Sequence, residues 1–124
     1  QYEIEIWGGG VQIRDYLHIN DLVNGLIILA QRGMEGEIYN LASGIPLRLK
    51  DFVKFISKQF SRKTPKIVST SSFDGDINEW YANIDKISKI GFKQAVNLEE
   101  GVKSSVKWYL KNKETFLKIR HERN

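Results

Sequence analysis

The stretch from Trp7 to Leu22, WGGGVQIRDYLHINDL, contains the residue types and spacing in this chain that best suggest chemistry. Three consecutive glycines, an arginine beside an aspartate, and an Asn-Asp pair precede an apolar run. A glycine-rich loop can cradle a phosphate where it leads into a helix, and a guanidinium can donate two parallel hydrogen bonds to phosphate oxygens. This stretch therefore either binds a phosphate or forms a hairpin turn with charged flanks.

The three glycines, Gly8 to Gly10, fit a turn better than a nucleotide-binding loop. The dinucleotide fingerprint requires a further glycine at the position of Ile13, and it requires a helix directly after the glycines. The residues after Gly10 instead alternate between apolar and polar, as a strand does. We therefore predict a turn here and no cofactor-binding residue in this chain.

Tyr109 and Lys113 match a Tyr-x-x-x-Lys pair, in which the lysine lowers the pKa of the tyrosine for proton transfer. Five tyrosines and thirteen lysines among 124 positions make a match by chance unsurprising. Tyr109 also lies on the apolar stripe of a predicted helix. We interpret it as a core aromatic and predict no catalytic residue in this chain.

Period-two alternation predicts two strands, one on each side of the glycine turn. Residues 2–7 form the first, with Trp7 on its polar face. Residues 11–19 form the second, and their alternation turns Arg14 and Gln12 away from the buried side. Arg14 would therefore be accessible to a ligand.

Four helices and two further strands are predicted downstream of this hairpin. Helical spacing of apolar residues with capping residues indicates the helices, and short apolar runs between turns indicate the strands. The helices are expected at about 20–33 with an inward face from Leu22 to Ala30, 47–60, 83–91 and 97–113, and the strands at 36–43 and 66–69; Asn20 or Asp21, Asn83 and Asn97 are the expected caps. The fold class is therefore α/β (α+β-like), a small mixed domain of short strands and about four helices.

Composition fits one globular domain and excludes several classes of protein. The 124 residues are 41% hydrophobic and 27% charged, which suffices for one core but not for two domains of ordinary size. Without cysteine no thiolate metal site can form, and His18 and His121 are too far apart in sequence to suggest a zinc pair. With no run of membrane-spanning length and no leader, we expect a cytoplasmic protein without a metal.

The net charge of +4 is concentrated at the C-terminal end. Residues 103–124 contain seven Lys or Arg and two Glu, a balance of +5, so residues 1–102 sum to −1. A single basic helix is more often a solvated surface than a nucleic-acid site. Nucleic-acid binding is therefore the weakest alternative, and residues 114–124 are expected to form a basic tail that frays.

Four segments carry a resemblance to a known family, in the order WGGGVQIRDYLHINDLVNGLIILA, GEIYNLASG, DGDINEWYANIDKISKIGF and LEEGVKSSVKWY. Together they resemble the C-terminal part of the extended short-chain dehydrogenases/reductases, the NAD-dependent nucleotide-sugar epimerases and dehydratases. The resemblance runs from about Ile4 to Tyr109. It implies that residues 1–113 are a substrate-binding lobe for a nucleoside-diphosphate sugar.

The same resemblance implies what this chain does not contain. In this family the NAD(P)-binding fingerprint, the catalytic Ser or Thr and the Tyr-x-x-x-Lys pair belong to an N-terminal Rossmann lobe. The chain, which begins at Gln1, is therefore expected to be an inactive fragment with an exposed apolar surface where that lobe would pack. Full-length members of this kind are often homodimers.

The resemblance also implies roles for particular residues. Arg14 matches an arginine that contacts the diphosphate, as a planar guanidinium is well suited to do. Asp76 matches an aspartate that hydrogen-bonds near the ribose, and Trp7 stands where an aromatic residue is often near the base. A surface arginine paired with a neighbouring carboxylate is the alternative interpretation of Arg14.

Phe73 departs from the family pattern, which commonly has a second phosphate-binding arginine at this position. Either Arg62 or Lys66 replaces that arginine, or diphosphate binding is weaker; Phe73 could also stack on a base or pack in the core. The departure motivates the alternative that this chain is a non-catalytic nucleotide-sugar-binding or regulatory domain.

The neighbours of these residues are interpreted as structural. Asp15 is expected to accept hydrogen bonds from a turn or an adjacent backbone amide, and His18 to be a bystander. Trp80 and Trp108 are expected to pack in the core or between lobes.

Overall fold

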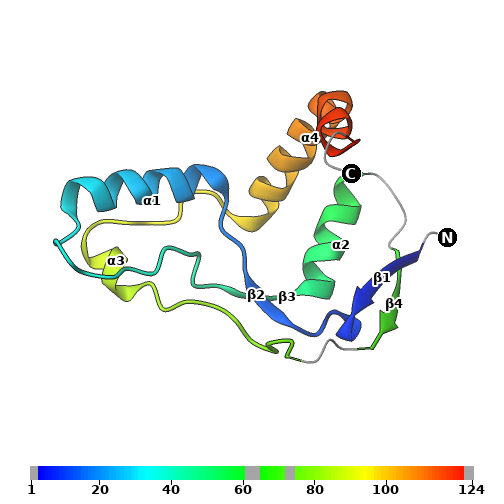
Figure 1. Cartoon of the computed structure of the whole chain (residues 1–124), viewed down its shortest axis with the longest axis horizontal. Helices are drawn as coiled ribbons and strands as arrows, with labels where there is room; N and C mark the ends of the chain where they lie inside the picture. The colour runs from blue at the N-terminus through cyan, green and yellow to red at the C-terminus, as the bar shows by residue number, and fades with distance from the viewer. Residues whose placement is uncertain (1–2, 61–64, 72–74, 122–124) are drawn as a thin grey trace.

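The computed structural model describes residues 3–60, 65–71 and 75–121 (Figure 1). Within these ranges the chain forms four α-helices, one 3₁₀ turn and two two-stranded sheets. The elements in order are β1 (Glu3–Trp7), η1 (Gly8–Gly10), β2 (Ile13–Asp15), α1 (Ile19–Arg32), β3 (Pro46–Arg48), α2 (Leu49–Gln59), β4 (Lys66–Thr70), α3 (Asp85–Lys89) and α4 (Leu98–His121). The mixed fold with short strands and four helices is as predicted.

In Figure 1 the β1–β4 pair lies at one end of the molecule and the β2–β3 pair lies nearer its middle, below α2. β1 pairs in parallel with β4, and β2 pairs antiparallel with β3. On its other edge β2 receives the segment after residue 75, because the Ile13 N–H donates to the Asn78 carbonyl (2.8 Å) and the Trp80 N–H donates to the Ile13 carbonyl (3.0 Å). This pairing brings residues 75–80 alongside Arg14.

The glycine turn is confirmed. Gly8, Gly9 and Gly10 have φ angles of 62°, 70° and 71°, a left-handed conformation that other residues adopt only with strain. Gly8 has a second constraint, because a Cβ atom there would lie 2.5 Å from the Gln12 Nε2 atom. The turn leads into β2 rather than into a helix, so the described residues do not fit a dinucleotide site of the fingerprint type.

The prediction for the second strand is wrong in its length and its faces. β2 covers only residues 13–15 of the predicted 11–19. Val11, expected inside, is exposed, while Gln12, expected outside, is buried. The three left-handed glycines change the direction of the chain before the strand begins, so simple alternation from residue 11 does not apply.

The predicted strand at residues 36–43 is not observed. These residues make no strand ladder within the described part of the chain, and Ile38 is 84% exposed. The inward face predicted for α1 is also wrong, since Val23, Leu26 and Ile27 are each about half exposed. Both errors concern apolar residues that the described parts of the chain do not cover.

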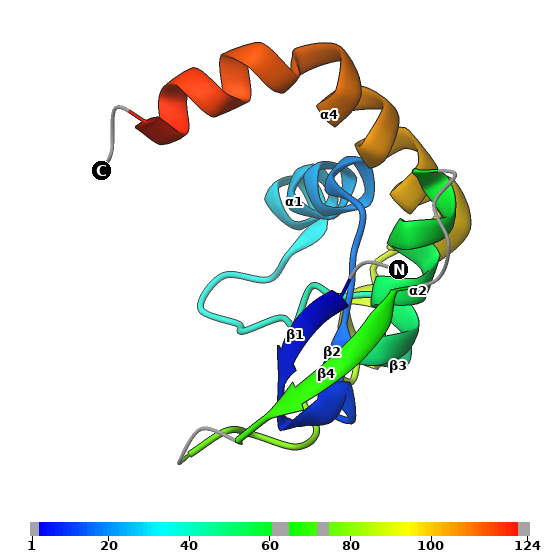
Figure 2. The ribbon, with the colours of Figure 1, turned by 90° about the vertical axis from the view of Figure 1, so that its right-hand side faces the viewer.

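The last helix extends beyond its expected end. α4 continues past Glu114, where the tail was expected to fray, to His121. Figure 2 shows α4 rising beside α2 and curving away from the sheets. No helix in residues 3–60, 65–71 and 75–121 is both long and apolar enough to cross a membrane.

Among the described residues the hydrophobic core is small. Its buried members come from β1, α3, α4 and the loop after α3: Ile6, Ile87, Phe92, Val102 and Val106. The accessible surface is 9486 Å². A compact monomer of the same mass would expose about 6,800 Å². The molecule is therefore much more open than a self-contained domain of this size.

Candidate functional site

Arg14 lies on β2 with its guanidinium held by three hydrogen bonds. Nη1 donates to the carbonyls of Ile13 (2.8 Å) and Ile77 (2.7 Å), and Nη2 donates to the Asp76 Oδ1 (2.9 Å). A guanidinium has five N–H donors, so two have no partner among the described residues. Arg14 is thus fixed in position and still able to donate two hydrogen bonds to an anion.

Asp76 is the ion-pair partner of Arg14 and also a hydrogen-bond acceptor for Gln12. Its Oδ2 accepts from the Gln12 Nε2 at 2.7 Å, and the side chains of Arg14 and Asp76 are 32% and 23% exposed. The structure therefore joins two residues that the sequence suggested separately. Arg14 is thus paired with a carboxylate, as its alternative interpretation predicted, but this ion pair uses only one of its N–H donors.

A hollow of about 400 Å³ opens over this ion pair. Its wall combines one cation, one carboxylate and large apolar side chains from β1 and the segment 75–80: Trp7, Arg14, Gly75, Asp76, Ile77 and Trp80. The two tryptophans are 58% and 62% exposed. Exposed indole rings beside a guanidinium suit a ligand with a planar ring and an anionic group. Three of the four predicted site residues thus line one hollow.

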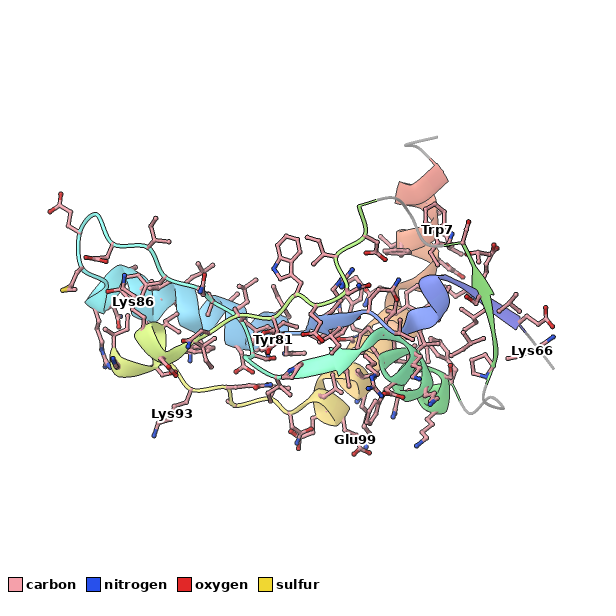
Figure 3. The ribbon with its side chains drawn as sticks, turned by 90° about the horizontal axis from the view of Figure 1, so that it is seen from below. Trp7, Lys66, Tyr81, Lys86, Lys93 and Glu99 are labelled. Atoms are coloured by element: carbon pink, nitrogen blue, oxygen red, sulfur yellow. The ribbon has the colours of Figure 1, made fainter. Side chains whose placement is uncertain are left out.

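The second phosphate-binding residue is not found among the described residues of this hollow. Phe73 and Arg62 lie outside the described residues. Lys66 pairs with the Glu3 Oε1 (2.8 Å) and stands opposite Glu3 in the sheet, whereas Trp7 stands opposite Thr70. Figure 3 shows Lys66 and Trp7 at opposite ends of the β1–β4 pair. Arg14 is therefore the cation that the described residues contribute to this hollow.

The expectation for Asp15 is confirmed. Its carboxylate accepts hydrogen bonds from the Ser43 N–H (2.8 Å), the Ser43 Oγ (2.6 Å) and the Gly44 N–H (2.9 Å). The Ala82 N–H also points to it at 3.4 Å. Asp15 thus joins β2 to two loops that are distant in sequence and supports the strand that carries Arg14.

The expectation that His18 is a bystander is wrong, because His18 is the N-cap of α1. Its Nδ1 accepts from the Asn20 N–H at 3.3 Å, and its Nε2 lies 3.0 Å from the Ser104 Oγ on α4. Since Ser104 donates its own hydroxyl to the Gly101 carbonyl, the tautomer that satisfies these contacts has its proton on Nε2. A histidine cap was missed because Ser, Thr, Asp and Asn are the usual capping residues.

Asp21, one of the two expected caps of α1, instead lies inside the protein. It is 2% exposed and accepts from the N–H groups of Ala95 (3.0 Å) and Val96 (3.0 Å). The sequence could not show that these amides, more than 70 positions away, approach it. Asp21 therefore ties α1 to the segment that precedes α4.

Tyr16 and Tyr109 are packing residues. Tyr16 stacks on Phe52 with ring centroids 3.9 Å apart, and burial raises the pKa of its hydroxyl, although the Arg14 charge opposes the shift. Tyr109 makes edge-to-face contacts with Phe60 (6.4 Å) and Phe116 (5.5 Å), but it is half-buried and not a member of the core, so the prediction of a core aromatic is wrong. The raised pKa of Tyr16 is in the wrong direction for a tyrosine that acts as a base.

Trp80 and Trp108 are not core residues, so that part of the prediction is wrong. Trp80 is 62% exposed in the hollow, and Trp108 is 59% exposed on α4. Packing of these two side chains against another lobe stays a prediction.

A second surface, which we call the α1 face, consists of the exposed apolar side chains of α1 and the following segment. Its members are Ile19, Val23, Leu26, Ile27, Met34 and Ile38. Apart from the buried Asp21, the only charged residue of α1 is Arg32 in its last turn. A helix that faces water normally carries charged side chains on that side. The α1 face therefore has the composition of a buried surface.

The segment after α1 lies close to the helix and is held from the other side by α3. A Cβ atom on Gly25 would lie 2.3 Å from the Leu41 Cδ1, so a larger residue there would require the Leu41 side chain to move. Lys86 of α3 pairs with the Glu37 Oε2 (2.5 Å), and its ammonium also donates to the Ile38 carbonyl (2.8 Å). The segment is thus positioned by its neighbours although it forms no ladder with the described residues.

Comparison with known proteins gives a consistent family match. The model of the "NAD dependent epimerase/dehydratase family" matches residues 1–42. An uncharacterized protein of Methanocaldococcus jannaschii is 34% identical over 118 residues, which are 94% of this chain and 36% of that protein. The chain spans about a third of the length of the curated relatives it matches.

Solved structures of such proteins share the architecture. An epimerase from Methanothermobacter thermautotrophicus has a TM-score of 0.85 at 26% identity, over 94% of this chain and 35% of that one. UDP-glucose 4-epimerase from Bifidobacterium longum, in complex with NAD+ and UDP, has a TM-score of 0.76 at 26% identity, over 90% of this chain and 36% of that one.

Proposed function

This chain belongs to the NAD-dependent epimerase/dehydratase family and corresponds to the C-terminal part of its members, and on this premise we propose that it is their substrate-binding lobe. The ligand of this lobe is a nucleoside-diphosphate sugar. One observation carries the proposal: Arg14 keeps two hydrogen-bond donors unpaired in a hollow between two exposed tryptophans. The UDP in the complex of the Bifidobacterium longum epimerase supports the same class of ligand.

Each part of the ligand has a chemically suitable residue in the hollow. The guanidinium of Arg14 donates to the diphosphate, since its charge is permanent and its donors are planar. The Asp76 carboxylate, which retains acceptor capacity beyond its bonds to Arg14 and Gln12, accepts from a ribose hydroxyl. Trp7 or Trp80 stacks on the base. The protein thus orients the nucleotide and leaves the sugar free for chemistry elsewhere.

The chemistry belongs to a partner lobe that is outside these 124 residues. That lobe holds the NAD(P), which supplies hydride transfer, and it contributes the acid and base residues. The α1 face, with its uncharged and exposed apolar side chains, supports a partner of this kind. We therefore propose that this chain alone shows no turnover. A cytoplasmic location and a homodimeric full-length enzyme remain predictions.

A second candidate function is a non-catalytic nucleotide-sugar-binding or regulatory domain. The observation that favours it is charge: Asp76 neutralises Arg14, and the described residues lining the hollow add no second cation. Phe73 stands where the family commonly has that cation. Binding of the diphosphate would then be weak, and the domain would respond to nucleotide sugars without converting them.

Titration of the folded chain with UDP, dTDP, GDP and CDP, followed by NMR, tests the proposed site. We expect millimolar affinity for at least one nucleotide, with chemical shift changes at Arg14, Asp76 and the indole N–H groups of Trp7 and Trp80. Arg14→Ala should abolish these changes, whereas Arg32→Ala, a matched loss of charge at the far end of α1, should leave them intact. No change near Arg14 with any nucleotide would overturn the site.

The coding sequence adjoining these residues separates the two candidate functions. An adjoining glycine-rich fingerprint and Tyr-x-x-x-Lys pair would favour the enzyme, because hydride and proton transfer need both. Their absence would favour the regulatory domain. Turnover of a nucleotide sugar by the 124 residues alone would contradict both.

A further inference from the structure

We call the group of hydrogen-bonded side chains of Gln12, Arg14, Asp15 and Asp76 the corner around β2. Gln12 is a buried member of this corner to which the proposed function gives no role. Its side chain is 5% exposed and bridges two parts of the chain. The Nε2 atom donates to the Trp7 carbonyl (2.7 Å) and to the Asp76 Oδ2 (2.7 Å). Gln12 thus joins the strand before the glycine turn to the ion-pair partner of Arg14.

The orientation of this amide follows from its partners. Both the Trp7 carbonyl and the Asp76 carboxylate are acceptors, so the Gln12 nitrogen must face them and the Oε1 atom must face away. Oε1 is then buried without a hydrogen-bond partner. A buried acceptor without a donor opposes folding. The two donated bonds therefore come with an unfavourable contribution that an apolar side chain would avoid.

The surroundings of Gln12 are adapted to keep these bonds. Gly8 leaves the space in which the Nε2 atom lies, since a Cβ atom there would approach it to 2.5 Å. A cation at position 12 would compete with Arg14 for the carboxylate, and an anion would repel Asp76. A neutral double donor satisfies Asp76 Oδ2 and leaves Oδ1 to Arg14.

We propose that Gln12 is a positioning residue of the substrate site. It fixes the Asp76 carboxylate, and Asp76 in turn holds the Arg14 guanidinium in the orientation that presents its unpaired donors to a diphosphate. Gln12 has no contact with the ligand and acts through Asp76. The inference rests on the proposed function for its ligand, but the order of Arg14 that it predicts is independent of any ligand.

The first experiment measures the guanidinium of Arg14 in the ligand-free protein by ¹⁵N NMR. We expect separate, slowly exchanging Nη signals in the wild type and averaged signals in Gln12→Met, which keeps the size of the side chain but removes both donors. Gln31→Met, at an exposed position of α1, is the matched control and should leave the Arg14 signals unchanged. If Gln12→Met fails to fold, Gln12→Glu replaces it; this variant keeps the shape but exchanges both donors for a charge that repels Asp76, so it should also average the Arg14 signals.

The second experiment measures affinity for UDP, or for whichever of the four nucleotides binds the wild type. We expect Gln12→Met to raise Kd about tenfold and Gln31→Met to leave it unchanged. In an Asp76→Ala background the effect of Gln12→Met should vanish, because its route to Arg14 is removed; an effect of undiminished size there would contradict the assigned route.

The outcomes separate the two proposals. If no nucleotide binds the wild type but Gln12→Met still averages the Arg14 signals, the proposed function fails and the positioning role holds. If a nucleotide binds and Gln12→Met changes neither the Arg14 signals nor Kd, the positioning role is overturned and the proposed function holds.

Discussion

The corner around β2 and the α1 face differ in whether the described residues supply what their side chains need, which is hydrogen-bond partners in the corner and burial on the α1 face. In the corner, the carboxylates of Asp15 and Asp76 each have at least two hydrogen-bond partners from distant parts of the sequence. On the α1 face, Val23, Leu26 and Ile27 are each about half exposed. Both carboxylates of the corner therefore find their hydrogen-bond partners among the described residues, while these apolar side chains are only partly covered by them.

The difference has a physical origin, because hydrogen bonds are directional and the hydrophobic effect is not. Hydrogen bonds need specific partners at about 3 Å, so they show directly whether a group is satisfied. Burial of apolar surface contributes roughly 25 cal/mol per Å² and is not directional, so another lobe or another copy can supply it equally well. The comparison teaches that the hydrogen bonds of the corner form within this chain, and it leads us to expect that the α1 face is covered by association.

The largest expected effect is at Asp15, where the comparison predicts a self-contained network. Asp15→Ala would leave the amides of Ser43 and Gly44 without their acceptor, and each buried unpaired group costs about 1–3 kcal/mol. We expect the free energy of unfolding, measured in urea, to fall by about 3 kcal/mol. Asp51→Ala, which removes an exposed pair with Lys54, is the control and should cost less than about 0.5 kcal/mol. If both variants lost the same free energy of unfolding, the Asp15 network would be no more stabilising than an exposed ion pair.

The next effect concerns association through the α1 face. We expect the wild-type chain to self-associate at high concentration, because the exposed apolar stripe is uncharged. The double variant Leu26→Lys with Ile27→Lys should be monomeric by light scattering, while its free energy of unfolding changes by less than about 1 kcal/mol because both positions are exposed. Leu110→Lys, at an exposed apolar position of α4, is the control and should not change the association. A strictly monomeric wild-type chain would contradict the expectation that the exposed α1 face drives association.

The two regions also differ in how much of their structure could be predicted from the sequence. Local patterns predicted all four helices, the glycine turn and the strand after Pro65, since spacing and turn chemistry are local. A structural role was also predicted for Asp15, but its partners Ser43 and Gly44, distant in sequence, were not. The pairing of Arg14 with Asp76 was not predicted, because nothing local links residues so far apart. The burial of Gln12 was missed for the same reason.

The errors on the α1 face have a different cause. The apolar spacing of α1 and the strand-like pattern of residues 36–43 both predicted burial. Apolar periodicity indicates which side chains should be covered, but it does not say whether the cover comes from the same chain. A strand likewise needs a ladder partner, and the described residues provide none for this segment.

A smaller effect is expected at His18, which joins the corner to the start of α1. His18→Ala removes the cap on the Asn20 N–H and the contact with Ser104, and loss of a helix cap costs about 1 kcal/mol. Asn20→Ala, the residue expected to cap from its sequence, should cost less, since no side-chain hydrogen bond of Asn20 is present among the described contacts. Thermal unfolding of both variants measures the difference. A larger loss for Asn20→Ala would restore the original prediction of the cap.

The smallest effect is the pH dependence of the Lys86–Glu37 pair, the polar contact that holds the segment beside the α1 face. The hydrogen bond from Lys86, and secondarily its charge, lowers the pKa of Glu37 below its usual 4.5. A carboxylate whose pKa is lowered on folding stabilises the protein above its usual pKa, and this contribution disappears as the pH falls through the lowered value. The Tm of the wild type should therefore exceed that of Glu37→Gln at pH 6 and approach it below pH 4, by a small amount because both side chains are about half exposed. A gap in Tm that is the same at both pH values would mean that Glu37 acts through its shape rather than its charge.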